Sequence, residues 1–356
     1  MRLLMLCALI LFGAVWWASY GVQRAETSYV MEQRQAAELL TRCFSAVRGY
    51  KEKLHIPMSQ EDYHQTGPYY TGITTTLGAI EAKRTTAWPD MGALCVRLLY
   101  EAGVRPGDRV AAGFSGSFPA MNLAVMAACQ SMKVEVIPIS SVGASTYGAT
   151  DPELTFPEML HRLVQDGVLT TDSAAVTLGG DNDTGDGMLP EQKMEILERL
   201  EQAGLVIFQE PKFLNNLEQR QEIYERQGPI QCFVSVGGNV TSMGVGERGI
   251  ALGQGVLDPR SAMPVTDQSG LVERYLGRGI PVVHLLNIKQ LTAEYGLPYD
   301  PVQWPDPGSS AVYYRIQYPL LPIVLGLLAA AGILCLCRHV RIQRSNMWHR
   351  ELPPTS

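Results

Sequence analysis

The sequence predicts an α/β fold in which a largely parallel sheet lies between two layers of helices. Short apolar runs recur along the chain, and stretches of helical length separate them. Strands that alternate with helices of this length favour a parallel sheet with right-handed crossovers, a three-layer arrangement of the Rossmann-like kind. A second observation concerns the two ends, where uncharged apolar segments long enough to cross a bilayer bracket this domain.

The expected strands are apolar runs bounded by glycine, proline or short polar residues. They fall at residues 109–114, 133–139, 174–178, 205–208, 231–236 and 280–286. Helices are expected at residues 89–102, 120–132, 191–203 and 214–226, and residues 74–83 read as the start of helical structure. No element is assigned between Gly237 and Ser269, where glycine, proline and serine are frequent.

Both ends of the chain are predicted to be transmembrane helices. Residues 3–22 and 318–337 each form a run of twenty residues without a charge, about 30 Å long as a helix, which matches the hydrocarbon core of a bilayer. Cleavage of the first run as a signal peptide is the alternative. Retention is favoured, because the basic region is Arg2 alone and the bulky Trp16 and Trp17 stand where cleavage needs small residues.

The charges that follow the second segment predict its orientation. Only Glu351 is acidic there, whereas four arginines follow the segment: Arg338, Arg341, Arg344 and Arg350. Short positively charged flanks stay in the cytoplasm. The sequence therefore predicts a two-pass protein of the cell membrane, with both termini cytoplasmic and the main domain outside. Arg24, just beyond the first segment, argues the other way.

The chain accordingly divides into five parts. Residues 1–25 and 315–338 are the membrane helices, 26–66 a membrane-proximal helical segment, 67–314 the α/β domain, and 339–356 a basic cytoplasmic tail. Without the charges of the two ends, 24 basic and 34 acidic residues remain, a formal charge of −10. No nucleic acid is expected as a partner, because an acidic domain binds polyanions poorly.

Four cysteines outside the membrane segments are expected to be buried free thiols. They have no close pairing, no CxxC spacing occurs, and their neighbours are apolar. These residues are Cys43, Cys95, Cys129 and Cys232.

Polar loops follow four of the expected strands, and they define the candidate binding site. Ligands bind at the carboxyl ends of parallel strands, where such loops converge. Glycines let backbone N–H groups approach a ligand, and hydroxyls and a helix N-terminus favour an anion such as a carboxylate. The candidate ligand-binding residues in these loops are Gly116, Ser140, Ser141, Gly180, Asp181, Asp183, Gly238 and Asn239.

A serine nucleophile is the catalytic alternative. Ser115 and Ser117 lie in Gly-x-Ser-x-Ser rather than in the Gly-x-Ser-x-Gly elbow, and one of them could simply cap the helix that follows. Lys83, in a concentrated polar run, is the candidate base. The acidic loop at residues 181–186 lacks EF-hand spacing, and neither a Walker lysine nor a dinucleotide glycine motif follows a strand, so no metal or cofactor is expected.

Several runs taken together resemble the bacterial family of poly-γ-glutamate system proteins. The similarity covers about residues 67–260 and is carried by residues 74–78, 81–85, 115–122, 140–145, 215–226 and 237–239. The resemblance implies a membrane protein of the cell envelope or capsule, found with the machinery that makes, exports or releases the anionic polymer poly-γ-glutamate. The expected partners are then the polymer or a γ-glutamyl fragment, the membrane subunits of the synthase, and the lipid bilayer.

Three functions follow from these observations, and the first of them, which is not catalytic, is favoured. The first is an accessory protein whose domain binds an anionic γ-glutamyl ligand, with Lys83, Arg84 and the serine–glycine loop meeting carboxylates. The second is an enzyme that hydrolyses or transfers γ-glutamyl amides through Ser115 or Ser117, with Lys83 as the base. The third is a purely structural membrane subunit, for which the polar loops would share no cleft.

Overall fold

The computed structural model describes residues 2–58, 66–246, 249 and 252–350. The chain forms two compact units. One, the helix-pair unit, joins the residues up to Thr27 with those from Tyr314 onward; the other, the α/β unit, is Ser28–Tyr313. The second unit is therefore an insertion between the two halves of the first.

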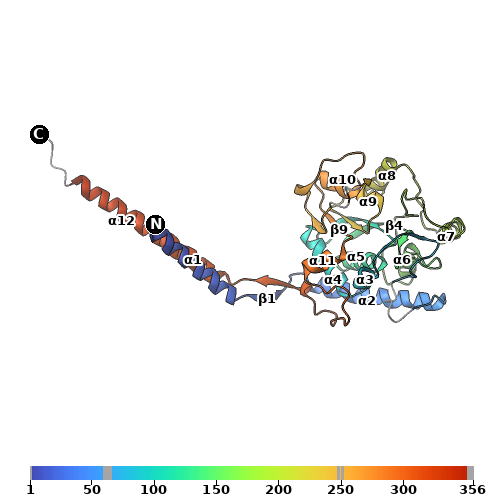
Figure 1. The fold of residues 1–356 in the computed structure, drawn as a ribbon, viewed down its shortest axis with the longest axis horizontal. Coiled ribbons are helices and arrows are strands. Elements are labelled where there is room, and N and C mark those ends of the chain that lie inside the picture. The colour runs from blue at the N-terminus through green and yellow to red at the C-terminus, as the bar shows by residue number, and fades with distance from the viewer. Residues whose placement is uncertain (1, 59–65, 247–248, 250–251, 351–356) are drawn as a thin grey trace. The chain divides into compact units, whose positions relative to one another are not determined.

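The helix-pair unit is built on a short antiparallel ribbon. Strand β1 (Gln23–Glu26) pairs with β10 (Tyr314–Gln317), and helices α1 (Arg2–Tyr20) and α12 (Leu320–Arg350) extend from it side by side (Figure 1). Small residues let the helices approach closely, since a Cβ built on Gly326 would lie 2.5 Å from Ala14 Cβ. Both helices contain a stretch long and apolar enough to cross a membrane, at Leu3–Tyr20 and Leu320–Ile342, as the sequence predicts.

The core of the α/β unit is a six-stranded sheet. Its order is β6-β4-β3-β7-β9-β8, and every neighbouring pair is parallel except β8 with β9. The strands are β3 (Arg109–Phe114), β4 (Glu135–Ser141), β6 (Ala175–Thr177), β7 (Cys232–Val236), β8 (Gly255–Leu257) and β9 (Val282–Leu285). A separate two-stranded parallel sheet pairs β2 (Thr74–Thr76) with β5 (Ala144–Ser145).

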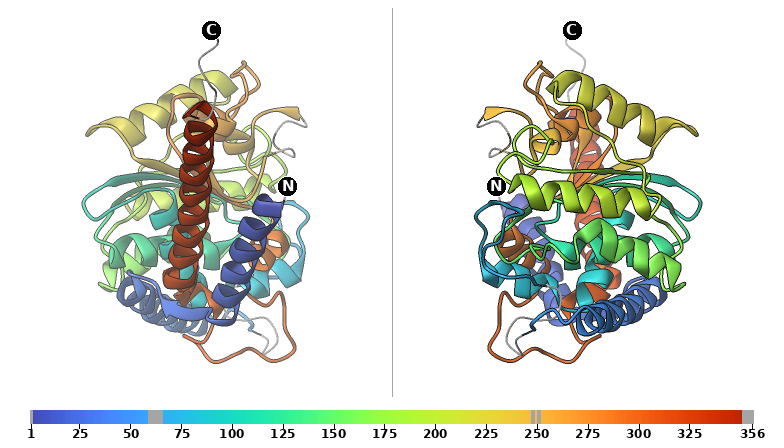
Figure 2. Two further views of the ribbon diagram at one scale, coloured as in Figure 1. Left: turned by 90° about the vertical axis from the view of Figure 1, so that its left-hand side faces the viewer. Right: turned by 90° about the vertical axis from the view of Figure 1, so that its right-hand side faces the viewer.

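Helices lie on both sides of the six-stranded sheet (Figures 1 and 2). On one side, Tyr224 and Tyr275 pack on Phe233; on the other, α2 packs against α4 and α5. The longer helices are α2 (Val30–Lys53), α4 (Asp90–Glu101), α5 (Pro119–Ser131), α6 (Phe156–Gln165), α7 (Pro190–Gln202), α8 (Phe213–Glu225) and α11 (Ile288–Tyr295). The shorter ones are α3 (Ile80–Thr86), α9 (Val240–Met243) and α10 (Leu271–Gly277). The predicted α/β fold with a mostly parallel, helix-flanked sheet is confirmed.

Some elements differ from the sequence prediction. Residues 205–208 form no strand and join the sheet only through a bridge between Val176 and Ile207, because β6 beside them is only three residues long. Residues 74–83 hold β2 and the start of α3 rather than helix alone. Helix α2 is an integral layer of the α/β unit, with Ala36, Leu40 and Cys43 fully buried.

The buried free thiols predicted from the sequence are confirmed. All four cysteines outside the membrane segments are buried and unpaired. Burial in apolar surroundings disfavours the thiolate and raises the pKa of each thiol well above its ordinary value. These cysteines are therefore core residues and poor nucleophiles.

A buried ion pair fixes the loop that follows β6. The Arg220 guanidinium of α8 lies 2.5 Å from the Asp183 carboxylate, and both side chains are almost fully buried. Asn216 Nδ2 also donates to Asp183, at 3.1 Å. Asp183 is thus held inside the unit as an anchor, and the preceding part of the loop is left facing the carboxyl edge of the sheet.

Candidate functional site

A pocket lies at the carboxyl edge of the six-stranded sheet. Phe114 at the end of β3 is in register with Ser140 on one neighbour and with Val236 on the other, so the three strands end together. The chain leaves β3 toward β4 and leaves β7 toward β9, in opposite directions, and a crevice opens where such paths diverge. The pocket has a volume of about 470 Å³ and is lined by the loops after β3, β4, β6 and β7 and by the segment joining β2 to α3.

The structure brings most of the predicted site residues together in this pocket. The catalytic candidates Lys83, Ser115 and Ser117 all line it. So do five of the predicted ligand-binding residues: Ser141, Gly180, Asp181, Gly238 and Asn239. The polar loops therefore share one cleft, which is the arrangement expected of a binding or catalytic site and not of a purely structural subunit.

Arg84 and Asp183 were predicted to bind the ligand but do not line the pocket, because each is held by an ion pair elsewhere. The Arg84 guanidinium donates to both carboxylate oxygens of Asp300, from Nε at 2.8 Å and from a terminal nitrogen at 2.5 Å. Asp183 faces Arg220, as described above. Neither the Arg84 guanidinium nor the Asp183 carboxylate therefore faces the pocket.

Gly116 and Ser140 also lie outside the lining of the pocket. The Gly116 carbonyl accepts a hydrogen bond from the Ala149 backbone at 2.8 Å, and a Cβ at position 116 would meet the Val142 carbonyl at 2.5 Å. Glycine is therefore required here for packing. Ser140 is fully buried, and its hydroxyl accepts from the Ser173 hydroxyl at 2.8 Å.

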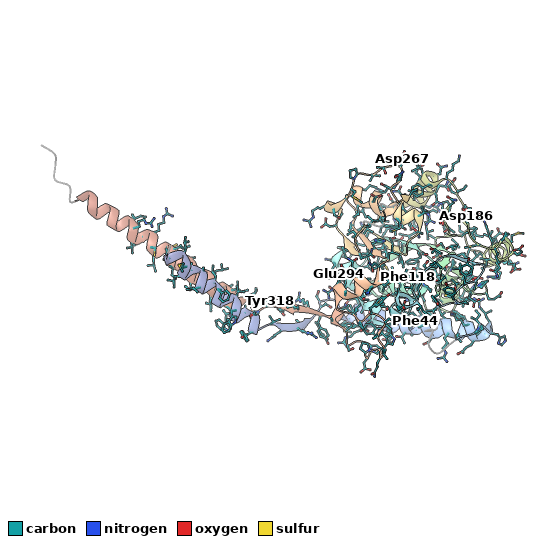
Figure 3. All side chains as sticks on the ribbon, viewed as in Figure 1. Phe44, Phe118, Asp186, Asp267, Glu294 and Tyr318 are labelled. Carbon is teal, nitrogen blue, oxygen red and sulfur yellow. The ribbon has the colours of Figure 1, made fainter. Side chains whose placement is uncertain are left out.

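The amine of Lys83 is buried inside this site, with 3% of the residue exposed. Its Nζ donates to the Ser117 carbonyl oxygen, lies 2.7 Å from Ser145 Oγ, and stands 3.7 Å from the ring centroid of Phe118. Figure 3 places Phe118 within the α/β unit. In the described part of the chain no carboxylate pairs with Lys83, and burial lowers the pKa of its amine to about 7.

The surroundings of Lys83 Nζ determine what the neutral amine can do. A neutral amine has two N–H groups and one lone pair, and two of its three contacts can only accept hydrogen. These are the Ser117 carbonyl oxygen and the face of the Phe118 ring. The third contact is with Ser145 Oγ, which accepts from Nζ at 2.7 Å and, when the amine is neutral, is close enough to give its own proton to the Nζ lone pair. Lys83 Nζ therefore lies within proton-transfer distance of the Ser145 hydroxyl.

The serines of the pocket form a connected group. The Ser115 hydroxyl donates to Ser117 Oγ at 3.0 Å, and the Ser117 backbone N–H donates back to Ser115 Oγ at 3.2 Å. The backbone N–H of Ser145 donates to Ser117 Oγ at 2.9 Å. The predicted pairing of Lys83 directly with the hydroxyl of Ser115 or Ser117 is absent from the described contacts, and Ser145 takes that place.

Two glycines leave the space that these hydroxyls occupy. A Cβ on Gly78 would lie 2.7 Å from Ser145 Oγ and 3.4 Å from Lys83 Cε. Gly237 adopts φ +86°, and a Cβ there would lie 2.7 Å from Ser115 Cβ. Real Cβ atoms do not approach other atoms this closely, so side chains at 78 and 237 would displace the serines.

Ser145 is the site residue that sequence reasoning missed. It reaches Lys83 because β2 and β5 pair in parallel, which places Thr74 opposite Ala144 and Thr76 opposite Ser145. Helix α3, which carries Lys83, follows β2 after three residues. The only signal in the sequence is that Ser145 ends one of the polar loops, and local patterning does not reveal which strand such a loop will meet.

Among the residues that the structure describes, two charged side chains line the pocket: Asp181, and Lys83, whose pKa burial lowers to about 7. An anionic ligand would thus meet a carboxylate and a weak cation, with hydroxyl and amide groups as neutral donors. Among the residues that the structure describes, no cluster of three or more histidine, cysteine, aspartate or glutamate side chains could hold a metal ion.

Comparisons with known proteins identify no relative of this chain. No protein-family model matches it, and no curated protein matches it. Among solved structures, an aspartate aminotransferase single mutant from Thermus thermophilus aligns with 12% identity and a TM-score of 0.14. The alignment covers 96% of this chain and 66% of the aminotransferase, just under two thirds of its length. A TM-score this low carries no argument about fold or function.

Replacing Lys83 with methionine is expected to change how stability depends on pH. The pKa of Lys83 is about 7 in the folded protein, against an ordinary value of 10.5. Between these values the unfolded chain binds more protons than the folded one, so the unfolding free energy of the natural protein rises with pH. The unfolding free energy rises by up to about 1.4 kcal/mol per pH unit, and this added stability is lost as the pH falls toward 7.

Urea unfolding of the two full-length proteins in detergent, at pH 7, 8 and 9, measures this effect. The natural protein is expected to gain stability relative to Lys83→Met at each step. Groups other than Lys83 are common to both proteins, so they cancel in the difference. A difference that stays constant with pH would mean that the folded Lys83 amine titrates as it does in the unfolded chain.

Proposed function

We propose that this protein is a serine acyl-transfer enzyme, a hydrolase or transferase of amides or esters, with Ser145 as the nucleophile and Lys83 as the general base. The observation that carries the proposal is the 2.7 Å contact between Lys83 Nζ and Ser145 Oγ inside a pocket where burial lowers the pKa of Lys83 to about 7. A base with a pKa near the working pH combines a free lone pair with a useful proton affinity. Serine–lysine pairs are a known variant of the serine nucleophile.

The proposed reaction has two halves. Ser145 Oγ attacks the carbonyl carbon of the substrate while its proton passes to Lys83 Nζ, and the resulting ammonium returns that proton to the departing amine or alcohol. Water then attacks the acyl-serine ester and gives a proton to Lys83. When the intermediate collapses, Ser145 Oγ leaves and regains that proton, and a carboxylic acid is released. If an amine attacks in place of water, the same steps transfer the acyl group.

The resemblance to poly-γ-glutamate system proteins supplies the substrate class to be tested first, the γ-glutamyl amide bond. The second candidate function is the accessory one, in which the same pocket binds a γ-glutamyl end beside the membrane subunits of a synthase. It is supported by the convergence of Ser115, Asn239 and the other neutral donors at one edge of the sheet. The enzyme is favoured, because Arg84 is held by Asp300 and Asp181 would repel carboxylates.

We also propose the finer details of fold and location. The order β6-β4-β3-β7 places the first sheet strand of the α/β unit at the centre, as in Rossmann-like sheets. The two apolar helices support a two-pass membrane protein whose α/β unit is extracytoplasmic, because the arginines after the second helix favour a cytoplasmic C-terminus.

A fluorophosphonate is expected to label Ser145 of the full-length protein in detergent. The labelling rate should rise with pH and level off above about 7, because Lys83 must lose its proton to act as a base. Ser145→Ala and Lys83→Met should abolish labelling, whereas Ser173→Ala, which removes a hydroxyl outside the pocket lining, should leave it unchanged. Peptide mass spectrometry identifies the labelled residue.

Gly78→Ala tests the contact between Lys83 and Ser145 without removing any functional group. Its added methyl group would lie 2.7 Å from Ser145 Oγ and should push the hydroxyl away from Lys83. We expect a large loss of labelling with a melting temperature close to that of the natural protein. Undiminished labelling of Gly78→Ala, or a label on a residue other than Ser145, would contradict the proposed nucleophile.

Poly-γ-glutamate is expected to be shortened by the natural protein and not by Ser145→Ala. Chain length and newly released ends are followed by gel filtration and amine derivatisation. Unchanged polymer together with a labelled Ser145 would mean that the enzyme acts on another acyl substrate. Unchanged polymer without labelling would leave the accessory function, which titration of γ-glutamyl oligomers into the protein would then test.

A reporter phosphatase that folds only outside the cytoplasm tests the proposed topology. Fused after Ser356 it is expected to be inactive, and inserted at the exposed Pro305, in the connection between α11 and β10, it is expected to be active. The reverse pattern would place the α/β unit in the cytoplasm.

A further inference from the structure

We propose that Ser117 supplies the hydroxyl that stabilises the oxyanion formed during acyl transfer, and that Ser115 is a positioning residue that orients this hydroxyl. The proposal rests on the proposed function, since it assigns a further role in the pocket where Ser145 acts. It is carried by the hydrogen bonds of Ser117, which leave its proton for a ligand.

The lone pairs of Ser117 Oγ are both occupied. A serine hydroxyl has two lone pairs and one hydrogen. One lone pair receives the Ser145 backbone N–H at 2.9 Å, and the other receives the Ser115 hydroxyl at 3.0 Å. Within residues 2–58, 66–246, 249 and 252–350 no acceptor takes the Ser117 hydroxyl hydrogen. Ser117 is 8% exposed and lines the pocket, so this buried donor is available to a molecule bound there.

Ser117 also lies beside the nucleophile. The backbone nitrogen that donates to Ser117 Oγ belongs to Ser145 itself. A single hydrogen bond therefore holds the Ser117 hydroxyl next to the residue that carries the attacking hydroxyl. The position of Ser117 does not depend on a bound substrate. Donors fixed in advance cost no reorganisation when the charge develops, and that is why they stabilise a transition state.

Two further features favour negative charge near Ser117. The residue immediately precedes the N-cap of α5, Phe118, so the positive end of a thirteen-residue helix lies next to it. Two donors into Ser117 Oγ also polarise its O–H bond and strengthen it as a donor. A neutral hydroxyl that is polarised in this way is suited to donate a hydrogen bond to a carbonyl oxygen that becomes an oxyanion.

Ser115 acts on Ser117 without needing to touch the substrate. Its hydroxyl donates to Ser117 Oγ and its oxygen receives the Ser117 backbone N–H, which closes a small ring of hydrogen bonds. Without Ser115 the Ser117 hydroxyl keeps its donor hydrogen but loses one of the two bonds that fix its direction. The loss of rate should therefore be smaller for Ser115→Ala than for Ser117→Ala.

Hydrolysis of p-nitrophenyl acetate by the full-length protein in detergent tests this assignment. For Ser117→Ala we expect kcat to fall by about 100-fold or more, the usual effect of removing one oxyanion donor, with KM changed less than about threefold because the donor acts mainly in the transition state. Ser115→Ala should lower kcat by less than Ser117→Ala does, because the Ser117 donor remains. Ser117→Thr, which keeps the hydroxyl, should recover part of the loss, and Ser173→Ala is the matched control outside the site.

Binding of methylboronic acid supplies a second measurement. Its tetrahedral adduct with a serine resembles the intermediate, so its affinity should fall for Ser117→Ala in proportion to kcat. If Ser117→Ala unfolds, as judged by circular dichroism, Ser117→Cys takes its place, because a thiol fills the space but donates weakly.

The outcomes separate this inference from the proposed function. If the fluorophosphonate labels Ser145 but Ser117→Ala retains kcat and boronate affinity, the assignment of Ser117 is overturned while the enzyme stands. If Ser145 is never labelled, both are overturned together. A loss confined to KM would show a binding contact and would overturn the oxyanion role.

Discussion

The parallel register of β3 with its two neighbours is the constraint on which the site depends. Because Phe114 stands opposite both Ser140 and Val236, the three strands end at one level and their loops must share the same edge. Everything in the pocket follows from that edge: Ser115 and Ser117 leave β3 there, and the segment before α3 is drawn in by the pairing of β2 with β5. The set of side chains that line the pocket is thus a consequence of how the sheet is aligned.

Burial of the Lys83 amine works against folding, because it removes water from a group that is charged when exposed. Its contacts with a carbonyl oxygen, a hydroxyl and the Phe118 ring compensate the lost hydration only in part, since burial still lowers the pKa to about 7. An amine that served stability alone would be paired with a carboxylate or exposed to water. A local loss of folding stability of this kind is characteristic of functional sites, where the stability of the rest of the fold offsets it.

Elements with strong local patterns could be predicted from the sequence, and elements set by distant partners could not. Strand β3 begins and ends where its apolar run does, and α5 differs from its expected range by one residue at each end. Strand β8 was missed because it is three residues long, opens on a glycine at φ +72°, and forms only against β9. The serine–glycine loops were recognisable because glycine and serine are typical of ligand-binding strand ends.

The same distinction explains the site. That Lys83 and Ser117 meet in one pocket was predictable from loop composition and strand order. Two facts depend on residues far away in the chain: Ser145 reaches Lys83 across 62 positions, and Asp300 holds Arg84 across 216. No local pattern encodes such pairs. Sequence reasoning therefore placed Lys83 and the serines of the loop after β3 in one pocket, whereas the hydroxyl that contacts the Lys83 amine in the structure is that of Ser145.

The insertion of the α/β unit between β1 and β10 has a consequence for proteolysis. Both ends of the unit continue into the helix-pair unit, one through Thr27 and the other through Tyr314. A single cut in either connection leaves the unit attached by the remaining one. Release of the unit from the helices requires two cleavages, so shedding by one protease event is ruled out by the order of the chain alone.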